Sequence, residues 1–440
     1  MPKIIINEID NTSAGIGPYN SFAVVVPGFT KCGADKKIFD ENGVYECSSQ
    51  KDFEDNIGCV DGRITTVEDS GNMAKSGEPI HLGNQIAYEL LGLGYKVLYK
   101  TLGDNVETAA LKQLDETNFW APLADKSTYD FRYIIVGMLN PTQKANNNIS
   151  DLANFEPGNF IDKPDNYLTG RGDCTALLDI PENKYIGETS QAKIITAIKK
   201  AASELTSANK YSAIFVPTVC YPDSVGHLKD YNNTKFPASF HYLACAANAA
   251  NNNFAEWYAV AGFSRGISPK FTIESTSVKL GEAAINALEP RNSNNELQKS
   301  VNVIAKIKNN YYLWGNRTAR TLGVAGADDG DLIASHFLNI RQLCSTIKKQ
   351  AYIACRRFTF DPNSETLWLN VTSVLTPMLE HMKADQGITD YQLVKVASNK
   401  KAEFKLKIRI IPIEAVEDFD IELSLEDSLG EPSVSARESI

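Results

Sequence analysis

Membrane-spanning and secretory segments are the first features that this sequence lacks. No apolar run approaches the ~20 residues that a helix needs to cross a bilayer. Met1-Pro2-Lys3-Ile4 is followed by neither a long apolar core nor a small-residue cleavage site, so we predict no signal peptide. The chain has 440 residues, 43% hydrophobic and 22% charged, which is ordinary for a soluble globular protein of two or three domains.

Metal-binding patterns are missing as well. None of the 8 cysteines forms a C-x-x-C pair, and the 5 histidines are scattered along the chain. Zinc sites usually bring two ligands close together in the sequence. We therefore expect no metal and no cofactor, and we expect reduced cysteines in a chain that folds in a reducing cytosol.

Positive charge is scarcer than negative charge. The chain carries 44 Lys and Arg against 54 Asp and Glu, a formal net charge of −10. Proteins bind nucleic acids through clustered Lys and Arg. The composition therefore argues against nucleic acid as a main partner.

Helices and strands alternate through the first two thirds of the chain, which predicts an α/β sheet with helices packed on it. A buried strand is expected at residues 21–29, ended by Pro27-Gly28. Gly92-Leu93-Gly94 is expected to stop a helix. The further expected helices are 83–93, 106–115, 190–206, 237–249 and 279–288, and the strands are 95–100, 132–137, 176–180, 212–217, 257–261, 271–273 and 301–307.

Two amphipathic helices are predicted near the C-terminus. Apolar residues recur at alternating spacings of four and three from Ile333 to Ala354, so we expect a helix over 332–357 that begins at an Asp331 cap. A second apolar stripe runs from Leu367 to Met382. Asn363 or Ser364 is expected to cap that helix, and Gly387 to end it.

Two strands of alternating character are predicted after these helices, at 403–411 and 419–425. Apolar residues alternate with Lys405, Lys407 and Arg409 in the first strand and with acidic residues in the second. Opposed charges of this kind attract by ~0.2–1 kcal/mol per pair. The strands form either a hairpin within the chain or a pairing with another copy. Their apolar members are Phe404, Leu406, Ile408 and Ile410, then Phe419, Ile421 and Leu423.

Candidate catalytic and ligand motifs are weak. Gly262-Phe263-Ser264-Arg265-Gly266 matches the nucleophile elbow of α/β hydrolases, but Pro269 and a predicted strand follow where the elbow needs a helix. A hydrolase with Ser264 as nucleophile, and His336 or His381 as base, is kept as an alternative. Asp328-Asp329-Gly330-Asp331 lacks EF-hand spacing and predicts a loop. Arg171-Gly172-Asp173 predicts a surface turn.

A family resemblance emerges from the order of several short motifs. They are Trp314-Gly315-Asn316-Arg317-Thr318, Leu338-Asn339-Ile340-Arg341-Gln342-Leu343, Phe360-Asp361-Pro362-Asn363 ahead of Leu367-Trp368, and Ile411-Pro412. Together they resemble the C-terminal domain of contractile phage tail sheath proteins. The N-terminal residues 4–13 and 23–29 are similar to the sheath opening. Asn316 departs from the family, which more often has a small residue there.

The resemblance implies a structural protein rather than an enzyme, with an outer α/β domain inserted between an N-terminal strand and a C-terminal α+β sheath domain. The implied division is as follows: 1–28 is the N-terminal linker strand and the first strand of the core, 29–300 the outer α/β insertion, 301–402 the C-terminal sheath core, 403–427 the C-terminal arm strands and 428–440 a flexible tail. Terminal strands are expected to link neighbouring copies, and the N-terminal members of this link are Lys3, Ile4, Ile5, Ile6 and Asn7.

The implied function is helical polymerisation around an inner tube, followed by contraction that drives the tube through a host envelope for genome delivery. Implied partners are further copies of the chain, the inner tail tube protein, and baseplate and tail terminator proteins, with no membrane insertion. The C-terminal domain is expected against the tube, with Glu380 and Lys383 as candidate contacts. The implied location is the virion, after assembly in the host cytoplasm. The sheath of a cellular injection or secretion system remains open as an alternative.

Overall fold

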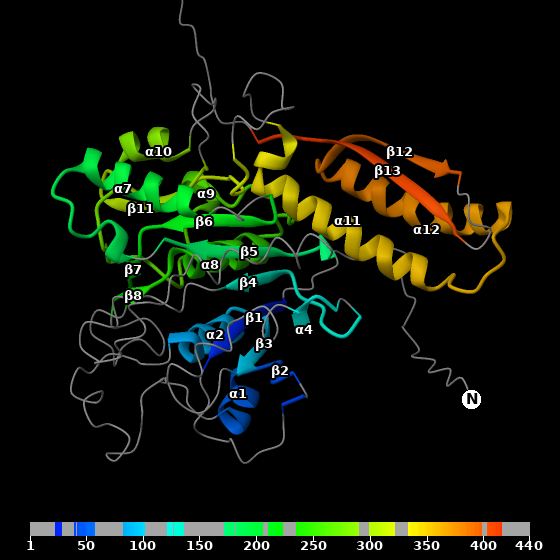
Figure 1. Ribbon diagram of the computed structural model, residues 1–440, viewed down its shortest axis with the longest axis horizontal. Helices are drawn as coiled ribbons and strands as arrows, with labels where there is room; N and C mark the ends of the chain where they lie inside the picture. Colours follow the sequence, from blue (N-terminus) through cyan, green and yellow to red (C-terminus); the bar gives the residue numbers. More distant parts are fainter. Residues whose placement is uncertain are drawn as a thin grey trace, which may run out of the picture.

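The structure is a computed structural model, and it describes residues 23–28, 39–40, 42–57, 82–101, 121–125, 127–135, 171–180, 182–205, 210–222, 235–289, 299–321, 333–397 and 403–415. Within these residues the fold is a mixture of helices and sheets. A large sheet with its helices forms one part, and two long helices with a β-hairpin form a second part beside it (Figure 1).

The large sheet has eight strands in the order β11-β10-β6-β5-β4-β1-β3-β2. Its central pairs are parallel, and only the outer strands β2 and β11 pair antiparallel with their neighbours. Both β1 and β10 belong to this sheet. The strands are β1 Ala23–Gly28, β2 Val44–Cys47, β3 Lys96–Thr101, β4 Tyr133–Ile135, β5 Thr175–Asp179, β6 Ser212–Val216, β10 Asn302–Ile307 and β11 Asn310–Trp314.

Helices cover this sheet. The helix α2 Leu82–Gly92 packs on β1 and β3, and α8 Ala238–Asn251 packs on β5 and β6 and against α2. The helix α10 Glu282–Leu288 packs on β10 and against α7 Gln191–Glu204. The shorter elements are α1 Gln50–Asn56, α4 Ala121–Leu123, the 3-10 helix η5 Glu182–Lys184, α9 Gly262–Arg265, and the small sheet of β7 Val219–Cys220, β8 Lys235–Phe236 and β9 Ser275–Thr276.

The second part of the fold contains α11 Leu338–Arg356, α12 Glu365–Ala384 and the antiparallel hairpin of β12 Ile388–Val396 with β13 Lys405–Pro412. These elements share a second hydrophobic core, in which Leu343, Leu375 and Leu379 are fully or almost fully buried. Tyr391 and Ile408 of the hairpin pack partly buried against it. Trp257, from the loop after α8, belongs to this second core and so ties the two parts together.

Most of the elements predicted from alternation are confirmed. The helix stop at Gly92-Leu93-Gly94 is also confirmed, because α2 ends at Gly92 and Gly94 has a φ of +92°. Two strand predictions are wrong: residues 257–261 form turns that lead into α9, and residues 271–273 precede the short strand β9. Their apolar side chains pack into the cores instead of joining a ladder. The strands β11 and β12 were not predicted, and the helix expected at 106–115 lies outside the described residues.

The predicted termini of the two C-terminal helices need correction. The helix α11 begins at Leu338, after a 3-10 turn at Ala334–His336, so its N-cap is Phe337 and the predicted Asp331 cap is wrong. The predicted cap of α12 is confirmed at Ser364, whose side chain accepts from the N–H of Leu367. At the other end of α12, Gln386 rather than Gly387 adopts the left-handed conformation, with φ of 59°.

Candidate functional site

The motif Trp314-Gly315-Asn316-Arg317-Thr318 joins the two parts of the fold. It starts at the end of β11, and its last residue, Thr318, bonds to the 3-10 turn before α11. Gly315 has a φ of +140°, and a Cβ there would lie 2.8 Å from Asn302 Cα. The position therefore needs glycine. Asn302 is fully buried, and its side chain bonds to Arg317 N, Arg317 O and Ile214 O at 2.8–3.0 Å.

Asn316 caps the helix α11 from outside the helix. Its main-chain carbonyl accepts from Leu338 N at 3.0 Å, and its side-chain Oδ1 accepts from Asn339 N at 3.0 Å. Its Nδ2 donates to Asn339 Oδ1 at 2.7 Å, and Asn339 Nδ2 donates to Trp257 O at 3.1 Å. Phe337 offers no side-chain cap, so Asn316 satisfies N–H groups that a helix start leaves open. The residue that departs from the family pattern thus has a defined structural role.

The next two motif residues fix the same joint. Arg317 is almost fully buried; its guanidinium lies 4.7 Å above the ring of Phe337 and pairs with Glu289 at 3.5 Å. Thr318 Oγ1 donates to Ser335 O at 2.9 Å. The motif residues therefore hold the 3-10 turn, the start of α11 and the end of α10 in one arrangement.

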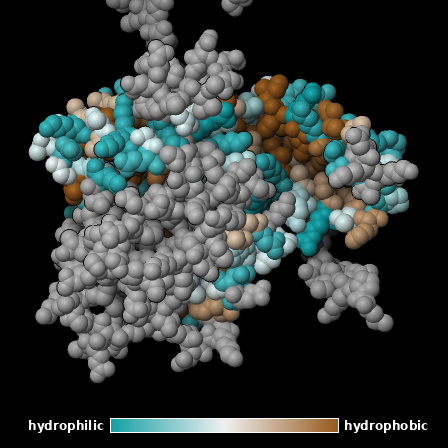
Figure 2. Space-filling view, viewed as in Figure 1, coloured by the Kyte–Doolittle hydropathy of each residue, from teal (hydrophilic) through white to brown (hydrophobic). Residues whose placement is uncertain are grey.

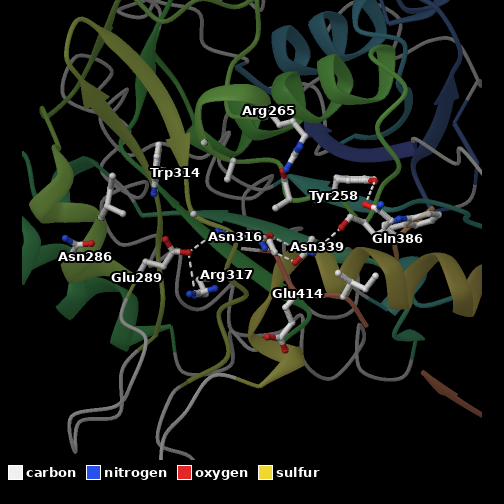
Figure 3. A pocket seen from close by; sticks show the side chains of 18 residues that line it. Tyr258, Arg265, Asn286, Glu289, Trp314, Asn316, Arg317, Asn339, Gln386 and Glu414 are labelled. Atoms are coloured by element: carbon white, nitrogen blue, oxygen red, sulfur yellow. Dashed lines mark hydrogen bonds and ion pairs between the residues drawn. The ribbon is translucent and has the colours of Figure 1, made fainter. Parts of the chain in front are cut away.

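A cavity of about 600 Å³ lies at this joint (Figure 3). Its polar lining includes Arg265, Glu289 and Glu414, and Figure 3 shows Asn316 and Asn339 between Arg265 and Glu414. The last described residues of the chain, 413–415, form part of the wall.

Buried ion pairs attach α11 to the large sheet. Arg132, which precedes β4, pairs with Glu256, and the two side chains are 1% and 8% exposed. The hydroxyl of Thr346 on α11 bonds to both of them. Removing one partner of a buried pair leaves an uncompensated charge, and the Thr346 hydroxyl connects α11 to this pair.

The surface turn predicted for residues 171–173 is wrong. Arg171 and Asp173 are buried and pair with each other at 2.9 Å. The Arg171 guanidinium lies 4.0 Å above the ring of Phe131, and Asp173 also pairs with Lys349 of α11 at 3.2 Å. Sequence reasoning missed this cluster because Phe131 and Lys349 lie about 40 and 176 residues along the chain from Arg171 and Asp173, and only the fold brings them together.

A groove of about 680 Å³ runs between β13 and α11. One wall is the inner face of β13, and the other includes Lys348, Ala351, Tyr352 and Cys355 of α11. Figure 2 shows hydrophobic residues gathered over the hairpin next to α11. Within the described residues β13 pairs only with β12, so its other edge faces this groove without a strand partner.

The period-two alternation predicted for residues 403–411 is confirmed in β13. Leu406, Ile408 and Ile410 face the second core, partly buried, and Phe404 packs there as well. Lys405, Lys407 and Arg409 lie exposed on the outer face, and the β12 residues opposite them are uncharged. The predicted partner strand 419–425, with Phe419, Ile421 and Leu423, lies outside the described residues, as do residues 3–7.

The two candidate tube contacts both lie exposed on α12 and bond to β12. Glu380 accepts from the Tyr391 hydroxyl at 2.6 Å, and Lys383 pairs with Asp390 at 3.1 Å. These bonds fasten the hairpin to α12. Any contact with a partner at this place would have to use side chains that already have an internal role.

Ser264 does not sit in a nucleophile elbow. It is exposed in the four-residue helix α9, and turns rather than a strand precede that helix. The three described histidines bond elsewhere: His241 to Tyr221, His336 to Ile333 N, and His381 to Asp385. Within the described part of the chain no histidine is placed to activate Ser264.

Searches for other site types were limited to the same residues. They contain no group of three or more His, Cys, Asp or Glu that could hold a metal ion. None of their helices combines the length and the apolar character that crossing a membrane requires.

Comparison with protein-family models and with curated proteins finds no match to this sequence. Solved structures do resemble it. A chain of the anti-feeding prophage baseplate, determined by cryo-EM, superposes with a TM-score of 0.61 at 12% identity, covering 97% of this chain and 99% of that chain. A chain of the PVC sheath complex, an extracellular contractile injection system in its contracted state, superposes with a TM-score of 0.58 at 13% identity, covering 97% and 98%. The fold of contractile sheath chains, predicted from the motif resemblance, is therefore confirmed.

Proposed function

We propose that this protein is the sheath subunit of a contractile tail, which polymerises helically around an inner tube and contracts to drive the tube through a host envelope. The observation that carries the proposal is the shared fold, which covers nearly the whole of both chains in each comparison. Partners under this proposal are further copies of the chain, the inner tail tube protein, and baseplate and tail terminator proteins. The particle is a virion assembled in the host cytoplasm.

The open edge of β13 supports the proposal that strands link the copies. A strand added there would extend the two-stranded sheet and place its inner side chains in the groove beside α11. The outer face of β13 is basic, and β12 supplies no acidic residue opposite it. The segment 419–425 of a neighbouring copy combines an apolar face with acidic residues, so it complements both faces. The isoleucine-rich residues 3–7 are the second linking strand.

The link is tested by reversing the charge on β13 with K405E/K407E/R409E. Electron microscopy of the purified wild-type chain at high concentration and moderate salt should show regular hollow tubes. At ~0.2–1 kcal/mol per opposed pair, the triple variant should raise the concentration needed for tubes roughly 3- to 100-fold. Adding D420K/E422K to the triple variant should bring this concentration most of the way back to the wild-type value.

Two controls sharpen this test. The variant K193E/K199E/K200E changes the charge by the same amount on α7, away from β13, and should form tubes normally. Deleting residues 3–7 should leave a folded monomer that cannot polymerise. Normal tubes from both the deletion and the β13 variant would refute the strand links.

The proposed tube contact at Glu380 and Lys383 needs its own control. Charge reversal at both positions should weaken binding to the tube, but it also breaks their bonds to Tyr391 and Asp390. The variant D390A/Y391F breaks the same internal bonds and leaves both candidate contacts in place. If the charge-reversal variant binds the tube as well as the wild type does, the proposed contact is refuted.

Two other functions remain as candidates. The likeness to an extracellular contractile injection system supports a sheath of a cellular injection machine, which the genes next to this one would distinguish from a phage tail. The hydrolase alternative rests only on the Gly262–Gly266 pattern. Monodisperse particles together with labelling of Ser264 by a fluorophosphonate probe would favour the hydrolase over a sheath.

A further inference from the structure

Phe360 is the most exposed large apolar residue in the described part of the chain. Its relative exposure is 100%, whereas Phe358, two residues earlier in the same loop, packs partly buried against the second core. An aromatic ring that stays in water forgoes the stabilisation that burial gives. The ring of Phe360 therefore does little to hold the single chain together.

The backbone at Phe360 is also unfavourable for this residue type. Its φ is 78°, in the left-handed region where a bulky side chain is an outlier. The loop is nevertheless held by hydrogen bonds: Asp361 N donates to Phe358 O at 3.1 Å, and Asn363 Nδ2 donates to Glu403 O at 3.3 Å just before β13. A strained residue that its surroundings hold in place indicates a function at that position.

The place of Phe360 in the fold points to what this function is. Phe360 lines the rim of the groove of about 680 Å³ between β13 and α11, together with Phe404, Leu406 and Ile408. Within the described residues, the edge of β13 that faces this groove has no strand partner. A strand added to that edge would therefore run beside the Phe360 ring.

The charge around the groove favours a second copy of the chain as the source of this strand. The outer face of β13 presents Lys405, Lys407 and Arg409, and the β12 residues opposite them are uncharged. A strand with one apolar and one acidic face fits such an edge. The chain has a net charge of −10, so another copy is a suitable source of an acidic strand.

We propose that Phe360 is a clamp residue, whose ring closes over an apolar side chain of a strand from a second copy seated in the groove. This inference rests on the proposed sheath function, in which strands link the copies. It does not depend on which segment of the second copy supplies the strand. The ring is exposed in the free chain and becomes buried on assembly, so it acts as an aromatic anchor of the interface.

The variant F360N separates a clamp from a structural role, because the free chain and the polymer should respond in opposite directions. The free chain should melt at a higher temperature than the wild type, since asparagine tolerates the left-handed region. The concentration needed for tubes, followed by electron microscopy, should nevertheless rise roughly 10- to 100-fold, as expected for loss of an interface anchor.

The variant L369A is the matched control. Leu369 on α12 is 63% exposed but does not line the groove. L369A should therefore form tubes at the wild-type concentration. If L369A and F360N raise this concentration equally, the effect is not specific to the groove and the clamp is refuted.

Photo-cross-linking shows which chain the ring touches. The photoreactive residue p-benzoylphenylalanine replaces Phe360 in one variant and Tyr352, on the α11 wall of the groove, in another. Tubes are grown from a mixture of isotope-labelled and unlabelled chains. Both positions should capture the same segment of a second copy, because one strand passes both of them.

The remaining outcomes distinguish failure of the clamp from failure of the sheath function. Wild-type tubes together with an unchanged tube concentration for F360N refute the clamp alone. Cross-links within one chain, or capture of different segments from positions 360 and 352, also refute the clamp while the sheath function stands. If the wild-type chain forms no tubes at any concentration, the sheath function fails and the clamp fails with it.

Discussion

Asn316 and Asn339 form a reciprocal pair in which the side chain of Asn316 both donates to Asn339 Oδ1 and accepts from Asn339 N. Asn316 follows the edge strand of the large sheet, and Asn339 lies in the first turn of α11. The pair therefore joins the two parts of the fold at a helix terminus. A small apolar residue at position 316 would leave both groups of Asn339 to find another partner.

The variant N316A should lower the free energy of unfolding by about 2–4 kcal/mol, because it removes a helix cap and leaves buried polar groups unpaired. Urea unfolding followed by circular dichroism measures this loss. N310A is the matched control, since Asn310 is exposed and makes one long side-chain bond of 3.4 Å; it should cost under about 0.5 kcal/mol. The single variant N339A and the double variant N316A/N339A complete the test. If the double variant lowers the free energy of unfolding by the sum of the two single effects, the pairing is contradicted.

Breaking the buried pair between Arg132 and Glu256 should be costly. R132M or E256Q alone should destabilise the protein by about 3–5 kcal/mol, whereas R132M/E256M should cost far less than the sum of the two. Chemical unfolding of the four proteins gives the coupling energy. The pair Lys96–Glu46 is a control of the same chemistry with exposed side chains, 59% and 56%, and K96A should cost at most about 1 kcal/mol.

Acid should destabilise the protein partly through His241. Burial lowers the pKa of His241 to about 3, so below pH 6.5 the unfolded chain binds a proton that the folded chain does not. Its contribution to stability is present above pH 6.5 and is lost as the pH falls toward 3. Between pH 8 and pH 5 the wild type should lose about 2 kcal/mol more than H241F does. Parallel pH profiles of the two proteins would show that His241 is protonated in the folded state.

Relieving backbone strain at Phe360 should stabilise the protein. Phe360 has a φ of 78° and a fully exposed side chain, in the loop between α11 and α12. F360N should raise the free energy of unfolding by about 1 kcal/mol, since asparagine tolerates the left-handed region better. F263N is a contrasting control, because Phe263 is also exposed but packs on Tyr312 and Trp314 at 4.9 and 5.1 Å. A lower melting temperature for F360N would mean that the ring makes a contact worth more than the strain.

Prediction from the sequence succeeded where a pattern is local. The apolar stripe of α12, its Ser364 cap and the alternation of β13 depend on neighbours a few residues away, and they were found. The start of α11 was misplaced because its cap comes from Asn316, more than 20 residues upstream. The strand predicted at 257–261 failed because Trp257 is buried in the second core rather than in a sheet.

The sequence by itself determined the α/β pattern, the amphipathic helices and the motif order that resembles a contractile sheath, since these depend on residue type and spacing. Only the tertiary structure decided which strand lies beside which. It paired β13 with β12, left the other edge of β13 facing a groove, and buried Arg171 with Asp173 instead of exposing them in a turn. The physical reason is that strand pairing and buried ion pairs depend on contacts between residues far apart in the chain, which local propensity does not encode.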